Sequence, residues 1–195
     1  MYGTENCKLK TENLVTTDLR DRAARIQMLL TDCDGVLTDA GVYYGEQGEV
    51  LKKFNLRDGM GVERLRRLVG VETGIVTGEN SPSVVARAAK LRITELHLGV
   101  RDKLMLLTGL LERTGLAASE VAFIGDDVND LAVLEVVGLA ACPADAMPPN
   151  QAIAHYVCAA KGGDGCFREL AELIIAAKQS IASQPASITQ LHENH

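Results

Sequence analysis

Two aspartates, Asp32 and Asp34, follow the apolar run that begins at Ile26, and Gly35 comes directly after them. An apolar run that ends at glycine is typical of a buried parallel strand whose carboxyl end opens into a loop. Carboxylates spaced i, i+2 lie on one side of an extended backbone, so both can face the same reacting atom. Their repulsion separates their proton affinities, which lets one act as an ionised nucleophile and the other as a general acid. Taken alone, the pair is more typical of a strand that ends in a polar turn.

A second acidic segment follows the apolar run at residues 121–124. Residues 126–130 bring four oxygen-bearing side chains into five positions directly after Gly125. So many acids at one strand end repel one another unless a cation is present, and an all-oxygen set of ligands suits Mg²⁺. The sequence therefore predicts a magnesium site at this segment.

Two further positions could bind a phosphate. Thr77 and Gly78 end the apolar run that starts at Thr73, and a hydroxyl followed by backbone amides can bind a phosphate oxygen. Lys103 follows Asp102 at the start of an expected helix, where its ammonium group can reach a phosphate. Taken alone, the first pair is more typical of a helix-capping turn, and the lysine is more typical of a solvated surface.

Strands and helices are expected to alternate along the chain, which predicts an α/β fold with a doubly wound, Rossmann-like parallel sheet. A β-hairpin is expected at residues 42–54, around the turn from Gly45 to Gly48. The first helix is expected to follow Asp58 and Gly59. The other expected helices cover residues 83–91, 103–113, 131–136 and 168–183, and the expected strands cover 26–31, 73–77, 95–98, 121–124, 139–142 and 156–157.

Composition restricts the kind of partner. The chain has 195 residues, of which 47% are hydrophobic, which predicts one globular domain, assigned to residues 23–183, between loose ends at 1–22 and 184–195. Its formal net charge of −6 disfavours nucleic acid and anionic membranes, so the expected partner is a small molecule. No apolar run approaches the roughly 20 residues of a membrane span, and no signal peptide is recognisable, so a cytoplasmic location is expected. The five cysteines lack metal-binding spacing and are expected to be reduced thiols.

The order of these segments resembles the haloacid dehalogenase superfamily of aspartate-nucleophile phosphatases. That order is DxDGVLTD, a strand ending in Thr-Gly, an isolated lysine and GDDxND, and it spans residues 28–170. The resemblance implies that Asp32 forms an aspartyl phosphate and that Asp34 is the general acid and base. It also implies that Thr77, Gly78 and Lys103 bind phosphate, that Asp32, Asp34, Asp126 and Asp127 hold Mg²⁺, and that Asp127 and Asp130 support the metal and the lysine. Phosphoryl transfer needs positioning and charge neutralisation, which such a set can supply.

The spacing of these motifs along the chain narrows the subclass of phosphatase. Between Asp32 and Thr77, and between Thr77 and Lys103, the chain has room for the hairpin and single helices but for no cap domain, so an open site is expected. Residues 42–61 resemble the small phosphatases of 3-deoxy-ulosonate phosphates, and this resemblance implies a homotetramer whose hairpins join in a central barrel. Residues 162–169 are similar to that group's glycine-rich carboxyl end, which can reach a neighbour's active site. A simple loop before the last helix is the alternative.

The hairpin itself carries apolar side chains at even spacings, namely Val42, Tyr44, Val50 and Phe54. Side chains at even spacings can face one side of a strand pair. Because they have little core of their own to enter, we expect a partner subunit to bury them.

Two sugar-acid phosphates are the candidate substrates. The residues expected to contact it are Arg57, Glu79, Arg87, Lys90 and Arg168. Relatives that act on the eight-carbon 3-deoxy-D-manno-octulosonate 8-phosphate carry arginine after Thr-Gly, where this chain has Glu79. The pattern of Glu79, Arg87 and Lys90 looks more like phosphatases of the nine-carbon 2-keto-3-deoxy-nonulosonate 9-phosphate, which is slightly favoured. Glu79 could accept hydrogen bonds from hydroxyls, and Arg87 or Lys90 could pair with the substrate carboxylate.

Two rival classes fit less well. A response-regulator receiver uses similar residues, but its acidic pair precedes the phosphate acceptor in the chain, whereas here the order is reversed. The other rival is a catalytically reduced oligomerisation module, as found attached to sugar-activating synthetases. No catalytic residue type is missing here, which disfavours that class; a phosphatase of another small sugar phosphate is a further alternative.

Overall fold

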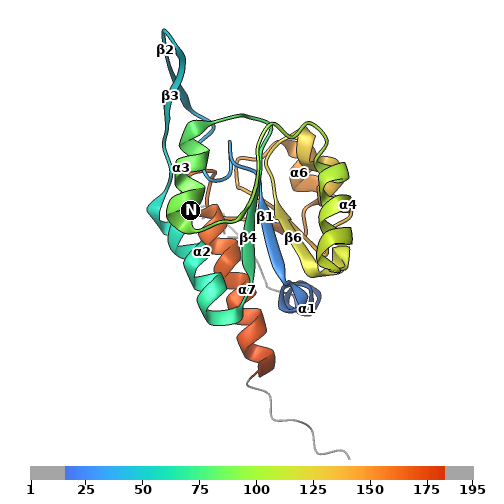
Figure 1. Ribbon diagram of the computed structural model, residues 1–195. Helices are drawn as coiled ribbons and strands as arrows, with labels where there is room; N and C mark the ends of the chain where they lie inside the picture. The colour runs from blue at the N-terminus through green and yellow to red at the C-terminus, as the bar shows by residue number, and fades with distance from the viewer. Residues whose placement is uncertain (1–15, 183–195) are drawn as a thin grey trace, which may run out of the picture.

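A parallel sheet forms the centre of the molecule (Figure 1). The computed structural model describes residues 16–182. Six strands pair in parallel in the order β5-β4-β1-β6-β7-β8, which confirms the predicted doubly wound α/β fold. These strands are β1 (Met28–Thr31), β4 (Glu72–Val76), β5 (Glu95–His97), β6 (Val121–Ile124), β7 (Leu139–Cys142) and β8 (Tyr156–Val157).

The strand order brings the motifs together. From β1 the chain moves to β4 and β5 on one side, and then crosses to β6, β7 and β8 on the other. The carboxyl ends of β1 and β6 therefore open at a topological switch point, where open α/β sheets form their ligand crevices. Strands β4, β1 and β6 are neighbours in the sheet, and Thr77, Asp32 and Asp126 follow them, in that order, within two residues.

Helices cover both faces of the sheet (Figure 1). Alternate strand residues point to opposite faces, so Leu29 packs in the core cluster under α1, α2, α3 and α7, while Leu30 packs in the cluster under α4 and α5. The α-helices are α1 (Thr17–Arg25), α2 (Leu56–Val69), α3 (Pro82–Leu91), α4 (Lys103–Thr114), α5 (Leu131–Leu134), α6 (Pro148–Ile153) and α7 (Cys166–Ala182), and the 3₁₀ helices are η1 (Ala118–Glu120) and η2 (Val128–Asp130). Within residues 16–182 no cap domain interrupts this order.

A two-stranded hairpin, β2 (Val42–Gly45) and β3 (Gly48–Lys52), projects beyond the sheet (Figure 1). Its exposed apolar side chains are Tyr43, Tyr44, Val50 and Leu51. A bulge between Tyr43 and Tyr44 interrupts the pairing, so the strict alternation behind the expected single apolar face does not hold. Phe54 also departs from that face, because it lies beyond β3 and packs against the main core.

Two local expectations were wrong, and one helix was not expected. Helix α2 begins at Leu56 rather than after Gly59, because the Asn55 side chain accepts the Arg57 backbone N–H and caps the helix earlier. Residues 17–22 are helical rather than loose, because α1 buries Leu19 and Ala23 against the core. Helix α6 was not expected at all, since its six residues are too few for a clear period. The other residues of the expected loose ends, 1–15 and 184–195, lie outside the described part of the chain.

The length of the helices and the state of the cysteines are two further features that the sequence predicts. Among residues 16–182, no helix is both long and apolar enough to cross a membrane. Four cysteines in the same range, Cys33, Cys142, Cys158 and Cys166, are buried free thiols, as expected, whereas Cys7 lies outside the described residues.

The glycine-rich segment at residues 162–165 packs against the turn that follows Asp34. The Gly163 backbone N–H donates to the Val36 carbonyl over 2.9 Å, and a Cβ at Gly162 would collide with the Gly35 carbonyl oxygen. In this chain the segment is therefore the loop that leads into α7. Helix α7 in turn belongs to the core and packs mainly against α2.

Asp58 of α2 is a buried carboxyl that accepts a hydrogen bond from the first turn of α7. Its Oδ1 accepts the Arg168 backbone N–H at 2.9 Å, while its Oδ2 has no hydrogen-bond partner. Burial raises the pKa of Asp58 from 3.8 to about 6. Because the folded chain then holds this proton more tightly than the unfolded chain does, Asp58 lowers the stability as pH rises from about 4 to about 6, and the loss persists above that range.

We therefore expect Asp58→Asn to be more stable than the wild type at pH 8, by up to about 3 kcal/mol, with the difference shrinking toward pH 4. Asparagine keeps the acceptor for the Arg168 N–H but carries no charge. Urea unfolding at both pH values measures the difference. Asp21→Asn on the exposed face of α1 is the matched control and should show no such gain. A less stable Asp58→Asn at pH 8 would mean that the charged cap outweighs burial.

Candidate active site

Asp32 lies at the centre of the site, directly after β1. Its backbone N–H donates to the Ile124 carbonyl of β6 over 3.0 Å, so the sheet pairing itself fixes the residue. Only 5% of Asp32 is exposed, and its Oδ1 lies 3.0 Å from the Lys103 ammonium. A buried, ion-paired carboxylate with a fixed backbone is suited to nucleophilic attack.

Lys103 is buried rather than solvated. It is the first residue of α4, which Asp102 caps, and side chains at a helix start lean back toward the amino end. Its ammonium contacts Asp32 and also Asp130 Oδ1 at 2.5 Å. The Phe123 ring lies 5.7 Å from the ammonium group. The lysine therefore joins the acids that follow two neighbouring strands, β1 and β6.

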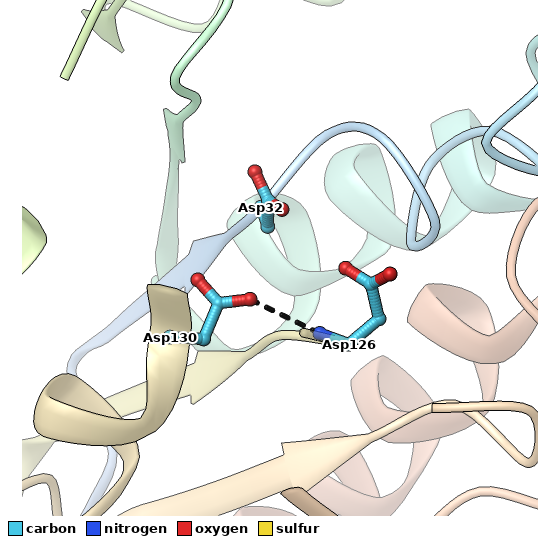
Figure 2. A group of neighbouring side chains, drawn as sticks. All are labelled: Asp32, Asp126 and Asp130. Atoms are coloured by element: carbon cyan, nitrogen blue, oxygen red, sulfur yellow. Dashed lines mark hydrogen bonds between the residues drawn. The ribbon is translucent and has the colours of Figure 1, made fainter. Parts of the chain in front are cut away.

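Three carboxylates lie close together at this point, as Figure 2 shows: Asp32, Asp126 and Asp130. One oxygen of each lies within 4.8 Å of the others. Asp130 comes from the end of η2, and its Oδ2 accepts the Asp126 backbone N–H at 3.1 Å, which closes the acidic loop on itself. Glycine is required beside the carboxylates, because a Cβ at Gly35 would collide with the Asp126 carboxylate.

The crowding of these acids perturbs their proton affinities. Burial and the charge of Asp130 raise the pKa of Asp32 to about 6, although Lys103 opposes the shift. Burial, and then repulsion from Asp32, Asp130 and Asp127, raises the pKa of Asp126 to about 8. Burial works to lower the pKa of Lys103, but the attraction of Asp32 and Asp130 outweighs it, and the net shift is upward.

This cluster is suited to a hard cation. Asp126 Oδ1 is buried without a hydrogen-bond partner, whereas both oxygens of Asp130 have protein partners. Three acids against one lysine leave negative charge that a divalent cation would neutralise, and carboxylate oxygens are its preferred ligands. Of the ligands expected from sequence, Asp32 and Asp126 belong to this cluster. Asp34 and Asp127 do not, and Asp127 Oδ1 instead accepts the Val128 backbone N–H.

Asp34 has its own partners. Strand β1 ends at Thr31, so Asp34 lies in the following turn rather than on extended backbone. Its Oδ2 accepts from Lys52 at 2.5 Å, and its Oδ1 accepts from Thr38 Oγ1 at 3.3 Å. The two aspartates therefore pair with different lysines, although both line the same hollow.

That hollow has a volume of about 390 Å³ and gathers residues from three of the predicted motifs. Its lining includes Asp32, Asp34, Thr77, Gly78, Glu79, Asp126 and Asp127. The Thr77 hydroxyl also accepts the Glu79 backbone N–H at 3.3 Å, which fixes the loop after β4. A hydroxyl, backbone amides and carboxylates around one open space are the groups that a phosphate monoester site needs.

Most of the residues expected to contact the sugar do not line this hollow. Arg87 lies over the Phe54 ring and donates to the Asn55 carbonyl at 2.8 Å. Lys90 lines a separate groove, and Arg57 is exposed at the start of α2. Arg168 pairs with Glu172 at 2.7 Å.

Sequence reasoning missed two supports of the site. Helix α6 holds the acidic loop, because Asn150 Nδ2 donates to the Asp127 carbonyl and the Met147 backbone N–H donates to the Asp126 carbonyl, both over 2.8 Å. The proline pair at its start was a signal for a helix. Lys52 had no distinguishing signal, since Lys53 beside it is the same residue type and points to Asp39 instead.

Known proteins are similar to this chain in sequence and fold. A model of haloacid dehalogenase-like hydrolases matches residues 89–170. The 3-deoxy-D-manno-octulosonate 8-phosphate phosphatase of Escherichia coli (strain K12) is 41% identical over 164 residues, which is 84% of this chain and 87% of that protein. The chain belongs to this phosphatase family of haloacid dehalogenase-like hydrolases. It is accordingly a phosphoric monoester hydrolase, as the motif order predicted.

Solved structures of the family agree with the fold. The octulosonate phosphatase of Yersinia pestis has a TM-score of 0.80 at 41% identity, and the match covers 86% of this chain and 90% of that chain. The octulosonate phosphatase of Moraxella catarrhalis has a TM-score of 0.79 at 33% identity, with 84% and 94% covered. That crystal structure contains a magnesium ion, a phosphate ion and a KDO molecule.

The crowding in this phosphatase predicts the effect of one added methyl group. A Cβ at Gly125 would collide with the Asp130 carboxylate and displace it from Lys103. We expect Gly125→Ala to lower kcat/KM for p-nitrophenyl phosphate by about 100-fold with an unchanged circular dichroism spectrum. Gly109→Ala is the control, because it adds its methyl group to open space on α4 and should leave the activity unchanged. Equal activity in both variants would contradict the proposed crowding.

Proposed function

We propose that this phosphatase hydrolyses the terminal phosphate of a 3-deoxy-2-ulosonic acid phosphate through an aspartyl phosphate on Asp32. The observation that carries the proposal is the buried Asp32 carboxylate, which touches the Lys103 ammonium at the floor of an open hollow. Phosphoryl transfer depends on positioning the reacting groups and on neutralising their charge. The fixed Asp32 backbone supplies the first, and the Lys103 ammonium supplies the second.

In the first half-reaction an Asp32 oxygen attacks phosphorus and the bond from phosphorus to the sugar oxygen breaks. Asp34 donates its proton to that leaving oxygen, so the sugar departs as a neutral hydroxyl. Lys103 neutralises the charge on Asp32 and on the transferred group, while the Thr77 hydroxyl and the Gly78 backbone N–H bind its oxygens.

In the second half-reaction Asp34, now a carboxylate, takes a proton from water as the water oxygen attacks phosphorus. The bond between phosphorus and Asp32 breaks, which returns the Asp32 carboxylate and releases inorganic phosphate. Two displacements therefore replace one difficult step.

Magnesium is the proposed cofactor. Asp32 and Asp126 would hold it, with Asp130 beside them. Asp127 stays a ligand predicted from the sequence, and Asp34 stays one only through its backbone carbonyl, because its carboxylate pairs with Lys52. The unpartnered Asp126 Oδ1 and the raised pKa of Asp126, caused mainly by burial, both support a cation at this point. When bound, Mg²⁺ supplies positive charge beside the phosphoryl oxygens.

The favoured substrate is 3-deoxy-D-manno-octulosonate 8-phosphate, because relatives that share 41% identity carry that name. Glu79 at the rim of the hollow supports the nine-carbon 2-keto-3-deoxy-nonulosonate 9-phosphate, which the sequence alone slightly favoured and which now becomes the second candidate. An acid at this position can accept hydrogen bonds from sugar hydroxyls. A cytoplasmic location stays a prediction.

A homotetramer is the proposed assembly. The hollow is open, and the four exposed apolar side chains of the hairpin, Tyr43, Tyr44, Val50 and Leu51, have no cover within residues 16–182. Arg87, Lys90 and Arg168 do not line their own hollow, which leaves them as candidates for a pocket shared between subunits. Association through the hairpins would bury the apolar side chains.

A substrate comparison tests the function. With Mg²⁺, kcat/KM for octulosonate 8-phosphate should exceed that for nonulosonate 9-phosphate by at least about tenfold. EDTA should abolish turnover and added Mg²⁺ should restore it. A preference for the nine-carbon acid would instead favour the interpretation of Glu79, and activity that survives exhaustive chelation would remove the metal from the mechanism.

Substitution of the two aspartates tests the mechanism. Asp32→Asn should abolish turnover of every phosphate ester because the nucleophile is lost. Asp34→Asn should lower kcat/KM for the sugar phosphate by about 100-fold or more, but should lower it much less for p-nitrophenyl phosphate, whose leaving group needs no proton. Equal losses on both esters would show that Asp34 is not the proton donor.

Sedimentation tests the assembly. The wild type should sediment as a tetramer at micromolar concentration, and Leu51→Glu on the hairpin should yield smaller species with a higher KM for the sugar phosphate. Met105→Glu is the control, because it places the same charge at an exposed apolar position on α4. A fully active wild-type monomer would overturn both the assembly and the shared pocket.

A further inference from the structure

Lys52 is the buried lysine at the end of β3, and its side chain is only 1% exposed. Its ammonium donates to Asp34 Oδ2 at 2.5 Å and lies 3.7 Å from Glu49 Oε2. We propose that Lys52 is a positioning residue for proton transfer, which holds the Asp34 carboxylate toward the leaving oxygen and away from the cation-binding acids. This inference rests on the proposed role of Asp34.

The contacts of the two aspartates separate their roles. Asp32 pairs with Lys103 inside the acidic cluster, whereas Asp34 pairs with Lys52 outside it. Without Lys52, the 3.3 Å contact with the Thr38 hydroxyl would be the only hydrogen bond to the Asp34 carboxylate from residues 16–182. A carboxylate with so weak a restraint, beside a divalent cation, would rotate toward the cation and become a ligand instead of a proton donor.

Lys52 is itself held from two sides. Glu49 lies next to it, and the other Glu49 oxygen accepts from the Ser81 hydroxyl at 2.5 Å. Ser81 is the residue that caps helix α3. A chain of polar contacts thus runs from Asp34 through the base of the hairpin to α3, so the lysine has little freedom to move away from the carboxylate.

Packing alone does not account for a lysine at this position. Burying an ammonium group costs solvation free energy that an apolar side chain of similar volume would not lose. The outer hairpin residues are exposed, and the adjacent Lys53 is 65% exposed in its pair with Asp39. The buried ammonium group therefore acts on Asp34, which is the acid that it contacts most closely.

Lys52→Met tests the proposal because methionine is also unbranched and only one atom shorter than lysine, and it removes the charge. We expect kcat/KM for octulosonate 8-phosphate to fall by about 10- to 100-fold, and kcat/KM for p-nitrophenyl phosphate to fall by no more than about threefold. Lys52→Arg should recover part of the sugar phosphate activity. Lys53→Met is the matched control and should leave both values unchanged. Equal losses on the two esters in Lys52→Met would overturn the positioning role.

The double variant Asp34→Asn/Lys52→Met separates this inference from the proposed function. If Lys52 acts through Asp34, the double variant should be no slower on the sugar phosphate than Asp34→Asn alone. If the two losses multiply, Lys52 acts elsewhere and the inference fails, even where Asp34→Asn still discriminates between the esters. If Asp34→Asn does not discriminate, the proposed function fails first.

Glu49→Gln keeps the test decisive if Lys52→Met does not fold, as judged by circular dichroism. This change removes a charge that anchors Lys52 and leaves Lys52 and Asp34, the two partners of the other ion pair, in place. We expect a smaller loss with the same selectivity for the sugar phosphate over the aryl phosphate. Wild-type selectivity in a folded Glu49→Gln variant, together with an unfolded Lys52→Met, would assign Lys52 a purely structural role and overturn the proposal.

Discussion

The confinement of three carboxylates around one ammonium group is the interaction on which the rest of the structure depends. Asp32, Asp126 and Asp130 crowd the single charge of Lys103, and the excess negative charge, added to burial, raises the pKa of Asp126 to about 8. Such a cluster is stable only if its surroundings oppose the repulsion. The same excess makes the site receptive to a divalent cation.

The surrounding elements supply that opposition through the backbone. The strand pairing fixes Asp32, and contacts from α6 hold the carbonyl groups of the acidic loop. Glycines at positions 35 and 125 provide space that any side chain would fill. The rigid sheet edge therefore lets charges of one sign remain close, which preorganises the site for a divalent cation.

Under the proposed mechanism, the hairpin has two roles that meet at its base. Its outer part offers the exposed apolar residues for association, while its last residue, Lys52, contacts Asp34. Two neighbouring aspartates therefore have different environments although they are two residues apart. Each pairs with its own lysine, and these lysines come from different elements. That separation is what allows one carboxylate to attack and the other to move protons.

The sequence by itself determined the succession of the strands along the chain and the residues that follow them, because apolar runs, glycines and capping residues are local signals. These signals predicted the parallel sheet and the placement of Asp32, Thr77 and Asp126 at one edge, and the order of the motifs resembled the family. Only the tertiary structure decided which acids meet: Asp130 joined the cluster, while Asp127 turned to cap a short helix. It also decided that Lys52 contacts Asp34 and that Arg168 pairs with Glu172. These outcomes depend on side-chain rotamers and on how separate elements pack together, and neither is encoded in the spacing of residues along the chain.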